Sequence, residues 1–261
     1  MDKNGGLLGH HDSEPVNFLN ADGRSPFLLL GDHAGNAFPC KLGNLGLSNE
    51  DRHRHIAWDI GVRAVGERLS ARLDALFVHQ GYSRLVVDCN RDPASDEAIA
   101  EVSDGSPVPG NARLDAGGRA ERIAAIHTPY HRAITKILNA RASRQQETIV
   151  ISLHSFTPAM AGEARPWEIG VLYSDGDPAF ARTLLEVLER TAGGAVGDNQ
   201  PYRMDATDYT VPLHAFATRL PYAEIEMRQD LIGDVEGQKL WSDRLADALE
   251  AARAAYLKPG P

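Results

Sequence analysis

The amino-acid sequence predicts an α/β protein, in which buried strands alternate with amphipathic helices. Short apolar runs such as 27–30 and 148–153 are typical of buried strands. Between them lie longer segments whose apolar residues recur every three or four positions, the spacing of a helix packed on a sheet. The chain has no internal repeat and no linker that would separate two domains. We therefore expect one domain over residues 25–261, after a loose arm over residues 1–24 that holds a short strand at most.

Composition restricts the classes of partner. The 261 residues are 43% hydrophobic, which allows a sizeable core, and the formal net charge is −9. Nucleic acids and anionic membranes bind basic faces, so this charge argues against both. Cys40 and Cys89 have no paired-motif spacing, which fits a reducing compartment. No apolar run approaches about 18 residues, and no hydrophobic signal core is present, so we expect a soluble, cytoplasmic protein.

The first predicted strand ends beside a histidine. Phe27–Leu30 runs into a Gly-Asp-His-Ala-Gly-Asn segment at 31–36 that contains His33 and Asn36. Glycines allow the backbone to turn sharply and to approach a ligand closely. His33 is therefore a candidate ligand-binding residue, although a lone histidine is more often structural.

A helix is predicted directly after Asp59. Apolar residues recur from there at helical spacing, at Val62, Val65, Leu69, Leu73 and Leu76. Asp59 has two interpretations, a cap of this helix or a carboxylate that binds a ligand or orients His33. Both remain open at the level of the sequence.

The stretch Tyr82–Pro93 begins with apolar residues typical of a buried strand and ends with charged and polar residues. Its apolar part reaches Val87 and is followed by Asp88, Asn90, Arg91 and Asp92. Open α/β sheets place their ligand sites where apolar strands end. Arg84 and Arg91 could form an anion pocket, because a guanidinium matches a carboxylate bidentately. The alternative is an Arg84–Asp88 ion pair that braces the strand end.

Two further strands are predicted to deliver polar residues. Thr148–Phe156 reaches His154 near its end, so two strands bring histidines to their carboxyl ends, and with a carboxylate these could bind zinc. Tyr222–Arg228 alternates strictly, which puts Glu224, Glu226 and Arg228 on one face. On a predicted helix over 119–144, His127 and His131 are four residues apart, a spacing that suits a metal or interior hydrogen bonds. We favour interior hydrogen bonds for this pair and leave His214 unassigned.

Four segments together resemble the N-formylglutamate amidohydrolase family. They are 31–36, 83–93 (Ser-Arg-Leu-Val-Val-Asp-Cys-Asn-Arg-Asp-Pro), 152–155 (Ser-Leu-His-Ser) and 224–231 (Glu-Ile-Glu-Met-Arg-Gln-Asp-Leu). They occur in the expected order, and the match covers about 27–232. The segment 88–91 is also similar to the Asp-Leu-Asn-Arg segment of aspartoacylases and succinylglutamate desuccinylases. Those enzymes belong with the zinc carboxypeptidases.

The resemblance implies a fold and a metal. The fold is a single three-layer α/β/α domain with a mixed central sheet, as in zinc carboxypeptidases and the wider phosphorylase/hydrolase-like group. It implies one Zn²⁺ or another divalent ion per chain, held by His33, His154 and a third ligand. The carboxypeptidase relatives have His-x-x-Glu where this chain has Asn36. Asp59 is therefore the preferred third ligand, and Asn36 is the alternative.

The resemblance also implies roles for the remaining residues. Glu226, or alternatively Glu224, would act as general base, and Arg84 would stabilise the oxyanion. Asn90, Arg91, Arg228 and Asn36 would bind the substrate. The implied reaction is hydrolysis of N-formyl-L-glutamate to formate and L-glutamate, by a monomer or a small homo-oligomer. The alternatives are another N-acyl amino acid or small peptide amide as substrate, and a metal-containing binding protein without turnover.

Overall fold

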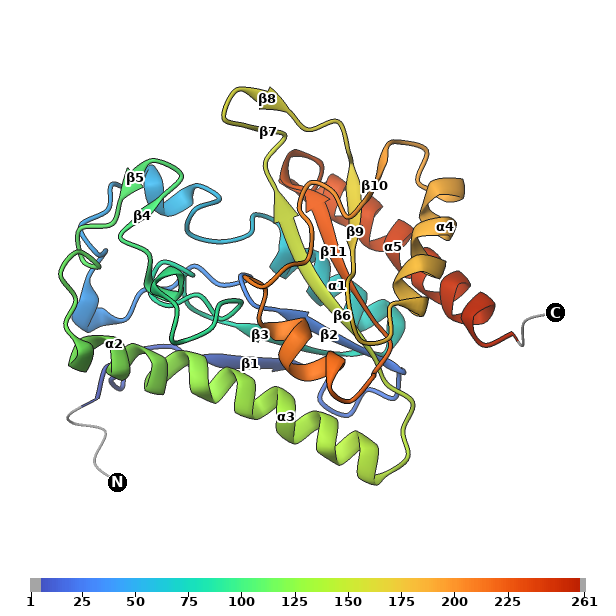
Figure 1. Ribbon diagram of the computed structural model, residues 1–261, viewed down its shortest axis with the longest axis horizontal. Helices are drawn as coiled ribbons and strands as arrows, with labels where there is room; N and C mark the ends of the chain where they lie inside the picture. The colour runs from blue at the N-terminus through green and yellow to red at the C-terminus, as the bar shows by residue number, and fades with distance from the viewer. Residues whose placement is uncertain (1–5, 259–261) are drawn as a thin grey trace.

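The computed structural model describes residues 6–258 and contains a mixed sheet of seven strands, in the order β1-β3-β2-β6-β11-β9-β10 (Figure 1). These strands are β1 (Val16–Leu19), β2 (Phe27–Gly31), β3 (Leu76–Gln80), β6 (Ile149–Phe156), β9 (Ile169–Leu172), β10 (Val196–Asp198) and β11 (Tyr222–Arg228). The run β3-β2-β6-β11 is parallel, and β1 and β9 are antiparallel to their neighbours β3 and β11. The expected mixed sheet is confirmed.

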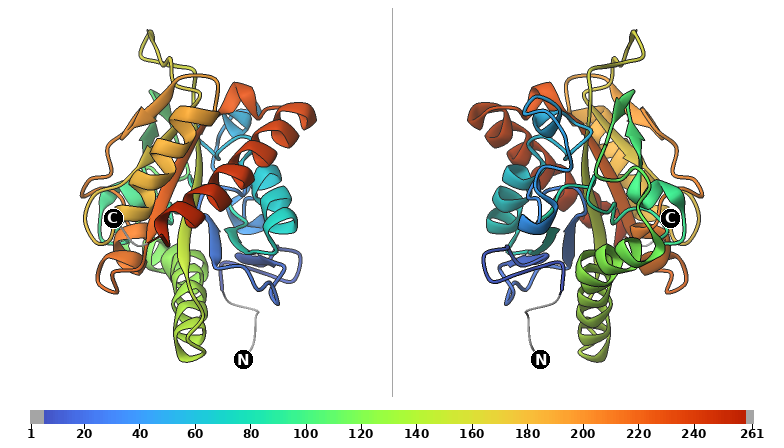
Figure 2. Two further views of the ribbon diagram at one scale, coloured as in Figure 1. Left: turned by 90° about the vertical axis from the view of Figure 1, so that its right-hand side faces the viewer. Right: turned by 90° about the vertical axis from the view of Figure 1, so that its left-hand side faces the viewer.

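Helices cover both faces of this sheet, which completes the expected three layers. One face packs against α1 (Val62–Leu73), α4 (Ala179–Thr191) and α5 (Val235–Tyr256), which lie close together in Figure 2. The other face packs against a continuous helix made of α2 (Ala116–Arg122), a π-helical turn (Ile123–His127) and α3 (Thr128–Ser143). Alternate residues of β2 enter the two cores, Leu29 on the first face and Leu28 and Leu30 on the second. No helix within residues 6–258 is long and apolar enough to cross a membrane.

Two small hairpins lie outside the sheet. They are β4–β5 (Val102–Ser103 and Ser106–Pro107) and β7–β8 (Ala159–Met160 and Glu163–Ala164). The β7–β8 hairpin projects beyond the body of the molecule at the top of both views in Figure 2. It follows β6 directly, so it stands at the carboxyl edge of the parallel strands.

The prediction of a strand at Tyr82–Val87 is wrong. Only Tyr82 pairs, in an isolated bridge with Ala37, and Arg84–Val86 form a turn. Leu85, Val86 and Val87 are all buried in the core that faces α3. Their apolar character therefore comes from enclosure of the whole segment by neighbouring elements, and not from the face of a pleated strand.

The N-terminal arm is more ordered than expected. Its short strand β1 pairs with β3, so that Phe18 lies opposite Val78, and Leu7 is buried. The Tyr82 hydroxyl donates a hydrogen bond to the carbonyl of Ser13 at 2.6 Å. β1 covers the edge of β3, which would otherwise expose unpaired backbone groups. Residues 1–5 of the arm lie outside the described part of the chain.

Candidate metal centre and active-site cavity

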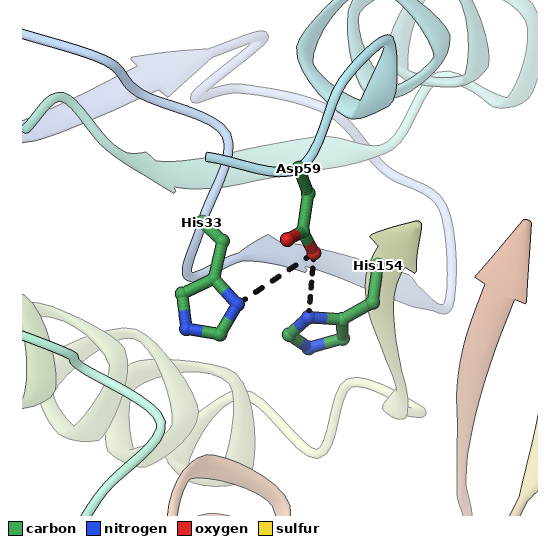
Figure 3. A group of neighbouring side chains, drawn as sticks. All are labelled: His33, Asp59 and His154. Atoms are coloured by element: carbon green, nitrogen blue, oxygen red, sulfur yellow. Dashed lines mark hydrogen bonds and ion pairs between the residues drawn. The ribbon is translucent and has the colours of Figure 1, made fainter. Parts of the chain in front are cut away.

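Two imidazoles and one carboxylate converge at the carboxyl edge of the sheet. Nδ1 of His33 and Nδ1 of His154 lie 3.6 and 3.0 Å from Oδ2 of Asp59 (Figure 3). All three side chains are buried, and their ligand atoms lie within 4.8 Å of one another. The geometry brings together the three residues that the sequence predicted as metal ligands.

The fold explains why residues so distant in sequence meet here. β2 and β6 are parallel neighbours, so His33 after β2 and His154 near the end of β6 reach the same edge. The backbone N–H of Asp59 donates to the His33 carbonyl at 2.9 Å. Gly61, and not Asp59, occupies the N-cap of α1, with φ of 85°. The Asp59 carboxylate is therefore not a helix cap and instead faces the two histidines.

The outer nitrogen of each imidazole already has a partner. Nε2 of His33 donates to Oδ1 of Asp88 at 2.7 Å, and Nε2 of His154 lies 3.0 Å from Oγ of Ser152. Nδ1 of His33 is buried without a hydrogen-bond partner among the described residues. A histidine held by a carboxylate through one nitrogen, with the other directed inward, is the usual arrangement of a metal ligand. The residues present fit a divalent ion with an open coordination position.

The carboxylates at this centre are held in their charged form. Burial by itself would raise the pKa of Asp59, but His33 and His154 outweigh burial and lower it. Burial likewise opposes ionisation of Asp88, yet Arg84 and His33 keep its pKa well below its usual range. The centre therefore contains two buried, ionised carboxylates, which favours a bound cation.

Two glutamates of β11 lie beside the histidine on β6. In the parallel pair β6–β11, Glu226 is opposite His154 and Glu224 is opposite Ser152. Both side chains are buried, and Oε2 of each lacks a hydrogen-bond partner within the described chain. Burial raises the pKa of Glu224 to about 7 and, together with Asp59 and Glu224, raises that of Glu226 well above its usual value. Glu224 can therefore exchange a proton near neutral pH.

A cavity of about 390 Å³ opens at this centre. Most of the residues that the sequence predicted for the site line it, namely His33, Asp59, Arg84, Asn90, Arg91, His154, Glu224 and Glu226. Its size lies in the range of small-molecule sites.

Arg84 makes the ion pair with Asp88 that was one of its two interpretations, and it also borders the cavity. Its Nε and Nη2 donate to Oδ2 of Asp88 at 3.0 and 2.6 Å, which is the expected ion pair. Nη1 lies 3.6 Å from Oδ1 of Asp59, and the side chain lines the cavity. The guanidinium is thus held rigidly while it borders the space beside the candidate ligands.

Asn90 and Arg91 line the cavity but are largely bonded to protein. Oδ1 of Asn90 accepts hydrogen bonds from the backbone N–H groups of Tyr209 and Thr210, both at 2.9 Å. Nη1 of Arg91 donates to the carbonyls of Asn90 and Thr207, and its Nε lies 3.3 Å from Glu97. Asn90 therefore anchors the neighbouring loop 199–209, and only part of Arg91 is available to a ligand.

Asn36 and Arg228 do not line the cavity. Nδ2 of Asn36 donates to the carbonyl of Arg52 at 2.7 Å. Nε of Arg228 donates to Asp230 at 2.8 Å, and Nη1 reaches backbone carbonyls of residues 165–167. Both residues thus lie outside the residues that border the cavity, and the side-chain N–H of Asn36 is directed to Arg52.

Sequence reasoning missed several residues of the cavity wall. Tyr202 and Arg203 line it from the turn-rich loop 199–209. Arg165, after the β7–β8 hairpin, donates to the Tyr202 hydroxyl at 2.9 Å and stacks 4.7 Å from its ring. Arg203 has no hydrogen bond or ion pair with any residue in the range 6–258. The length of this irregular segment between β10 and the π-helical turn Pro212–Phe216 was the available signal, since long loops in compact domains are often functional.

The predicted interior role of the histidine pair on the helix agrees with the contacts. Nε2 of His127 donates to the Arg91 carbonyl at 3.0 Å, and Nε2 of His131 donates to the Cys89 carbonyl at 2.8 Å. His214 belongs to the π-helical turn Pro212–Phe216, and its Nε2 lies 3.0 Å from Nδ1 of His131. These three histidines lie behind the loop that carries Asp88 and do not line the cavity.

The fold and the site define an α/β protein with a candidate metal centre at the carboxyl edge of its sheet. The family model of N-formylglutamate amidohydrolase matches residues 25–233, and the chain belongs to this amidohydrolase family. A solved gene product of Agrobacterium tumefaciens is similar, with 34% identity, a TM-score of 0.93 and coverage of 97% of this chain and 100% of the other.

A second solved structure, described as N-formylglutamate amidohydrolase from Ralstonia eutropha JMP134, has the same fold. It has 20% identity and a TM-score of 0.66, and the match covers 93% of this chain and 98% of the other. Comparison with curated proteins finds no significant sequence match.

Proposed function

We propose that this protein is a metal-dependent amidohydrolase that converts N-formyl-L-glutamate and water to formate and L-glutamate. The observation that carries the proposal is the group His33, Asp59 and His154 beside Glu226 in one buried cavity. Membership of the amidohydrolase family supports cleavage of an amide. The name of the similar Ralstonia eutropha protein supports the formyl substrate.

His33, Asp59 and His154 would hold the metal, and we propose zinc because two imidazoles and a carboxylate suit it. When bound, this ion would supply a Lewis acid that polarises the acyl carbonyl and acidifies water. Asp88 would orient His33 through the hydrogen bond at 2.7 Å, and Ser152 would do the same for His154.

Glu226 is the proposed general base. It would accept a proton from the attacking water and then deliver it to the leaving amide nitrogen. It lies opposite His154, whereas Glu224 lies opposite Ser152, two residues further from the carboxyl edge where the cavity opens. A raised pKa suits both proton transfers, because the group must be able to gain and to lose a proton.

Arg84 is proposed to stabilise the negative charge that develops on the carbonyl oxygen during attack. Asp88 holds two of its nitrogens, so the guanidinium is oriented before the reaction begins. A preoriented donor of this kind costs no reorganisation in the transition state.

Arg91 and Arg203 are proposed to bind the substrate carboxylates. Arg203 lines the cavity and makes no ion pair with the described residues, so its charge is available to an anionic ligand. Arg91 already forms an ion pair with Glu97 and donates to two backbone carbonyls, so only part of its guanidinium can contact a ligand. Asn90 contributes indirectly, because it holds the loop 199–209 that carries Arg203.

Another N-acyl amino acid or a small peptide amide is the second candidate substrate. The observation that favours it is the partly exposed Met160 and Tyr202 on the cavity wall, which could contact an apolar group. The third alternative, a binding protein without turnover, has against it the two buried glutamates beside the candidate ligands.

The test is release of products from a panel of substrates by the zinc-loaded protein. The panel contains N-formyl-glutamate, N-formyl-norvaline, N-acetyl-glutamate, N-succinyl-glutamate and a small dipeptide. We expect formate and glutamate in equal amounts from the first compound, with much weaker turnover of the others. Preferred hydrolysis of another compound would reject the formyl-glutamate assignment, and absence of turnover with metal bound would favour the binding protein.

A further inference from the structure

The buried segment Tyr82–Pro93 lacks the backbone partners that a strand would have. Apart from the bridge at Tyr82, it forms turns and irregular backbone. Leu85, Val86, Val87 and Cys89 are nevertheless buried. Buried carbonyl groups need hydrogen-bond donors, so an irregular buried segment must obtain them from side chains or from other loops.

Asn111 donates to the Leu85 carbonyl and Thr210 to the Cys89 carbonyl, and one helix supplies further donors as a row of side chains. Four side chains on the continuous helix 116–143 each donate to a carbonyl of this segment. They are Arg122 to Val86 at 3.2 Å, His131 to Cys89 at 2.8 Å, His127 to Arg91 at 3.0 Å and Arg119 to Pro93 at 3.1 Å. We call this row the helix brace.

The π-helical turn Ile123–His127 aligns the two halves of the brace. Arg119 and Arg122 precede this turn. His127 is its last residue, and His131 follows it. In a regular α-helix, residues five apart point about 140° away from each other. A π-helical turn accommodates one extra residue, which brings His127 back toward the side of Arg122. Such turns occur frequently at functional sites.

The hydrogen bonds define the tautomer of the central histidine. Nε2 of His131 faces a carbonyl, which can only accept, so this nitrogen carries the proton. Nδ1 of His131 must then accept the hydrogen bond from Nε2 of His214. Burial, with His127 and His214 beside it, lowers the pKa of His131 to about 3, in agreement with a neutral ring.

Asp88 lies between the braced carbonyls of Val86 and Cys89. Its carboxylate contacts His33 through one oxygen and Arg84 through the other. We propose that the helix brace, and His131 above all, positions Asp88 and through it sets the orientation of the His33 ring toward the metal. His127 and His131 are thus positioning residues. This inference rests on the proposed metal site but not on the identity of the substrate.

The experiment compares His131→Leu and His131→Gln with Arg141→Leu. Arg141 is a matched control, because it is buried on the same helix and donates to the carbonyls of Ser25 and Pro26, away from the site. Zinc affinity is measured by competition with a chromogenic chelator, and stability is measured by thermal unfolding. Neither measurement needs the substrate.

We expect His131→Leu to weaken zinc binding by about 10-fold, the lower end of the range for lost outer-shell partners. Arg141→Leu should lower the unfolding temperature and leave zinc affinity within about 2-fold of the wild type. His131→Gln should restore most of the affinity, because its amide can donate to the Cys89 carbonyl. Equal zinc affinities in the two leucine variants, or no rescue by glutamine, would overturn the proposal.

Two further measurements keep the test decisive. If His131→Leu does not fold, His127→Leu removes the next donor of the brace, and its side chain borders a surface groove beside α3. If the wild type binds no zinc, the proposed metal site fails, and the ¹⁵N resonances of the His33 ring in the zinc-free protein test the brace instead. A His33 signal unchanged in His127→Leu and His131→Leu would reject it. Zinc binding without release of formate would reject only the proposed substrate.

Discussion

The candidate site is built from two regions that hold their side chains in different ways. At the sheet edge, His154 and Glu226 project from paired strands, whose positions are set by backbone hydrogen bonds between β6 and β11. In the segment Tyr82–Pro93, Arg84 and Asp88 project from irregular backbone. It is held by side chains of the helix 116–143 and by single backbone hydrogen bonds to Ala57 and Ala98. The first region depends on a ladder that no single side chain creates. The second depends on individual donors.

This difference predicts two kinds of mutational effect. A substitution at the sheet edge should remove the chemistry of one side chain and leave the backbone in place, because ladder bonds do not involve side chains. A substitution in or behind the segment should instead shift several groups together, since Asp88 contacts both His33 and Arg84. Substitutions in the two regions should therefore differ measurably in metal affinity, activity and stability.

The largest effect is expected at the proposed ligands. His33→Ala, His154→Ala and Asp59→Ala should each reduce metal content from about one ion per chain to near zero, because three protein ligands are the minimum of such a site. Metal analysis after dialysis measures this, with His79→Ala as the control for loss of a buried histidine away from the cavity. Retention of metal by Asp59→Ala would remove Asp59 from the ligand set.

Replacement of the proposed base comes next. Glu226→Gln should lower kcat by about 10²–10⁴-fold with metal still bound, because general-base catalysis contributes that much. The measurement is the rate of formate release with metal content determined in parallel. A greater loss of kcat in Glu224→Gln than in Glu226→Gln would assign the base to the deeper glutamate.

The outer partners of the two histidines test the comparison directly. Asp88→Asn should weaken zinc binding by about 10–100-fold, because a charged partner of His33 is lost and Arg84 is released as well. Ser152→Ala removes a neutral partner of His154 on a strand, which costs about 1 kcal/mol, or about 5-fold. Chelator competition on both variants gives the two affinities. Equal losses would mean that the two regions support the metal site equally.

The arginines of the cavity wall separate recognition from catalysis. Arg203→Ala should raise KM for N-formyl-glutamate by about 10-fold, the loss of a charged hydrogen bond, with little change in kcat. N-formyl-norvaline should be affected less if Arg203 binds the side-chain carboxylate. Arg91→Ala is the comparison, and a larger effect there would transfer this role to Arg91.

The smallest effect on activity is expected for Glu224→Gln, which should change stability with pH instead. The pKa of Glu224 is raised to about 7, so between pH about 4.5 and 7 the folded protein keeps a proton that the unfolded chain has lost. Its contribution to stability is therefore present at low pH and is lost as pH rises through this window. In the metal-free protein, Glu224→Gln should flatten this decline by at most about 3 kcal/mol.

Denaturant unfolding at several pH values measures this effect, and the exposed Glu186→Gln is the control. An unchanged decline in Glu224→Gln would mean that Glu224 ionises normally in the folded protein.

The strand-end residues of the site could be predicted because local patterns carry them. Apolar runs before His33 and through His154 indicate buried strands, and strict alternation places Glu224 and Glu226 on one face. These patterns repeat within a few residues, so they can be read without knowledge of the rest of the fold. The resemblance to a family then added the role of Asp59, which periodicity left open between ligand and helix cap.

Other features of the site could not be predicted because distant elements decide them. Arg228 shares the parity of Glu226, but Asp230 and the carbonyls of 165–167 draw its side chain away from the cavity. Arg203 lines the cavity from the loop 199–209, whose end Asn90, more than 100 residues earlier in the chain, anchors.

Local patterns in the sequence were enough to predict an α/β chain, two strands that each lead to a histidine and two glutamates on one face. The pairing of β2 with β6 and the irregular backbone of Tyr82–Pro93 depend instead on packing between distant parts of the chain. An apolar run has the same composition whether a sheet or a helix encloses it, and its hydrogen-bond partners are chosen by packing. Here those partners are side chains of the helix 116–143, and the same contacts hold Asp88 against His33.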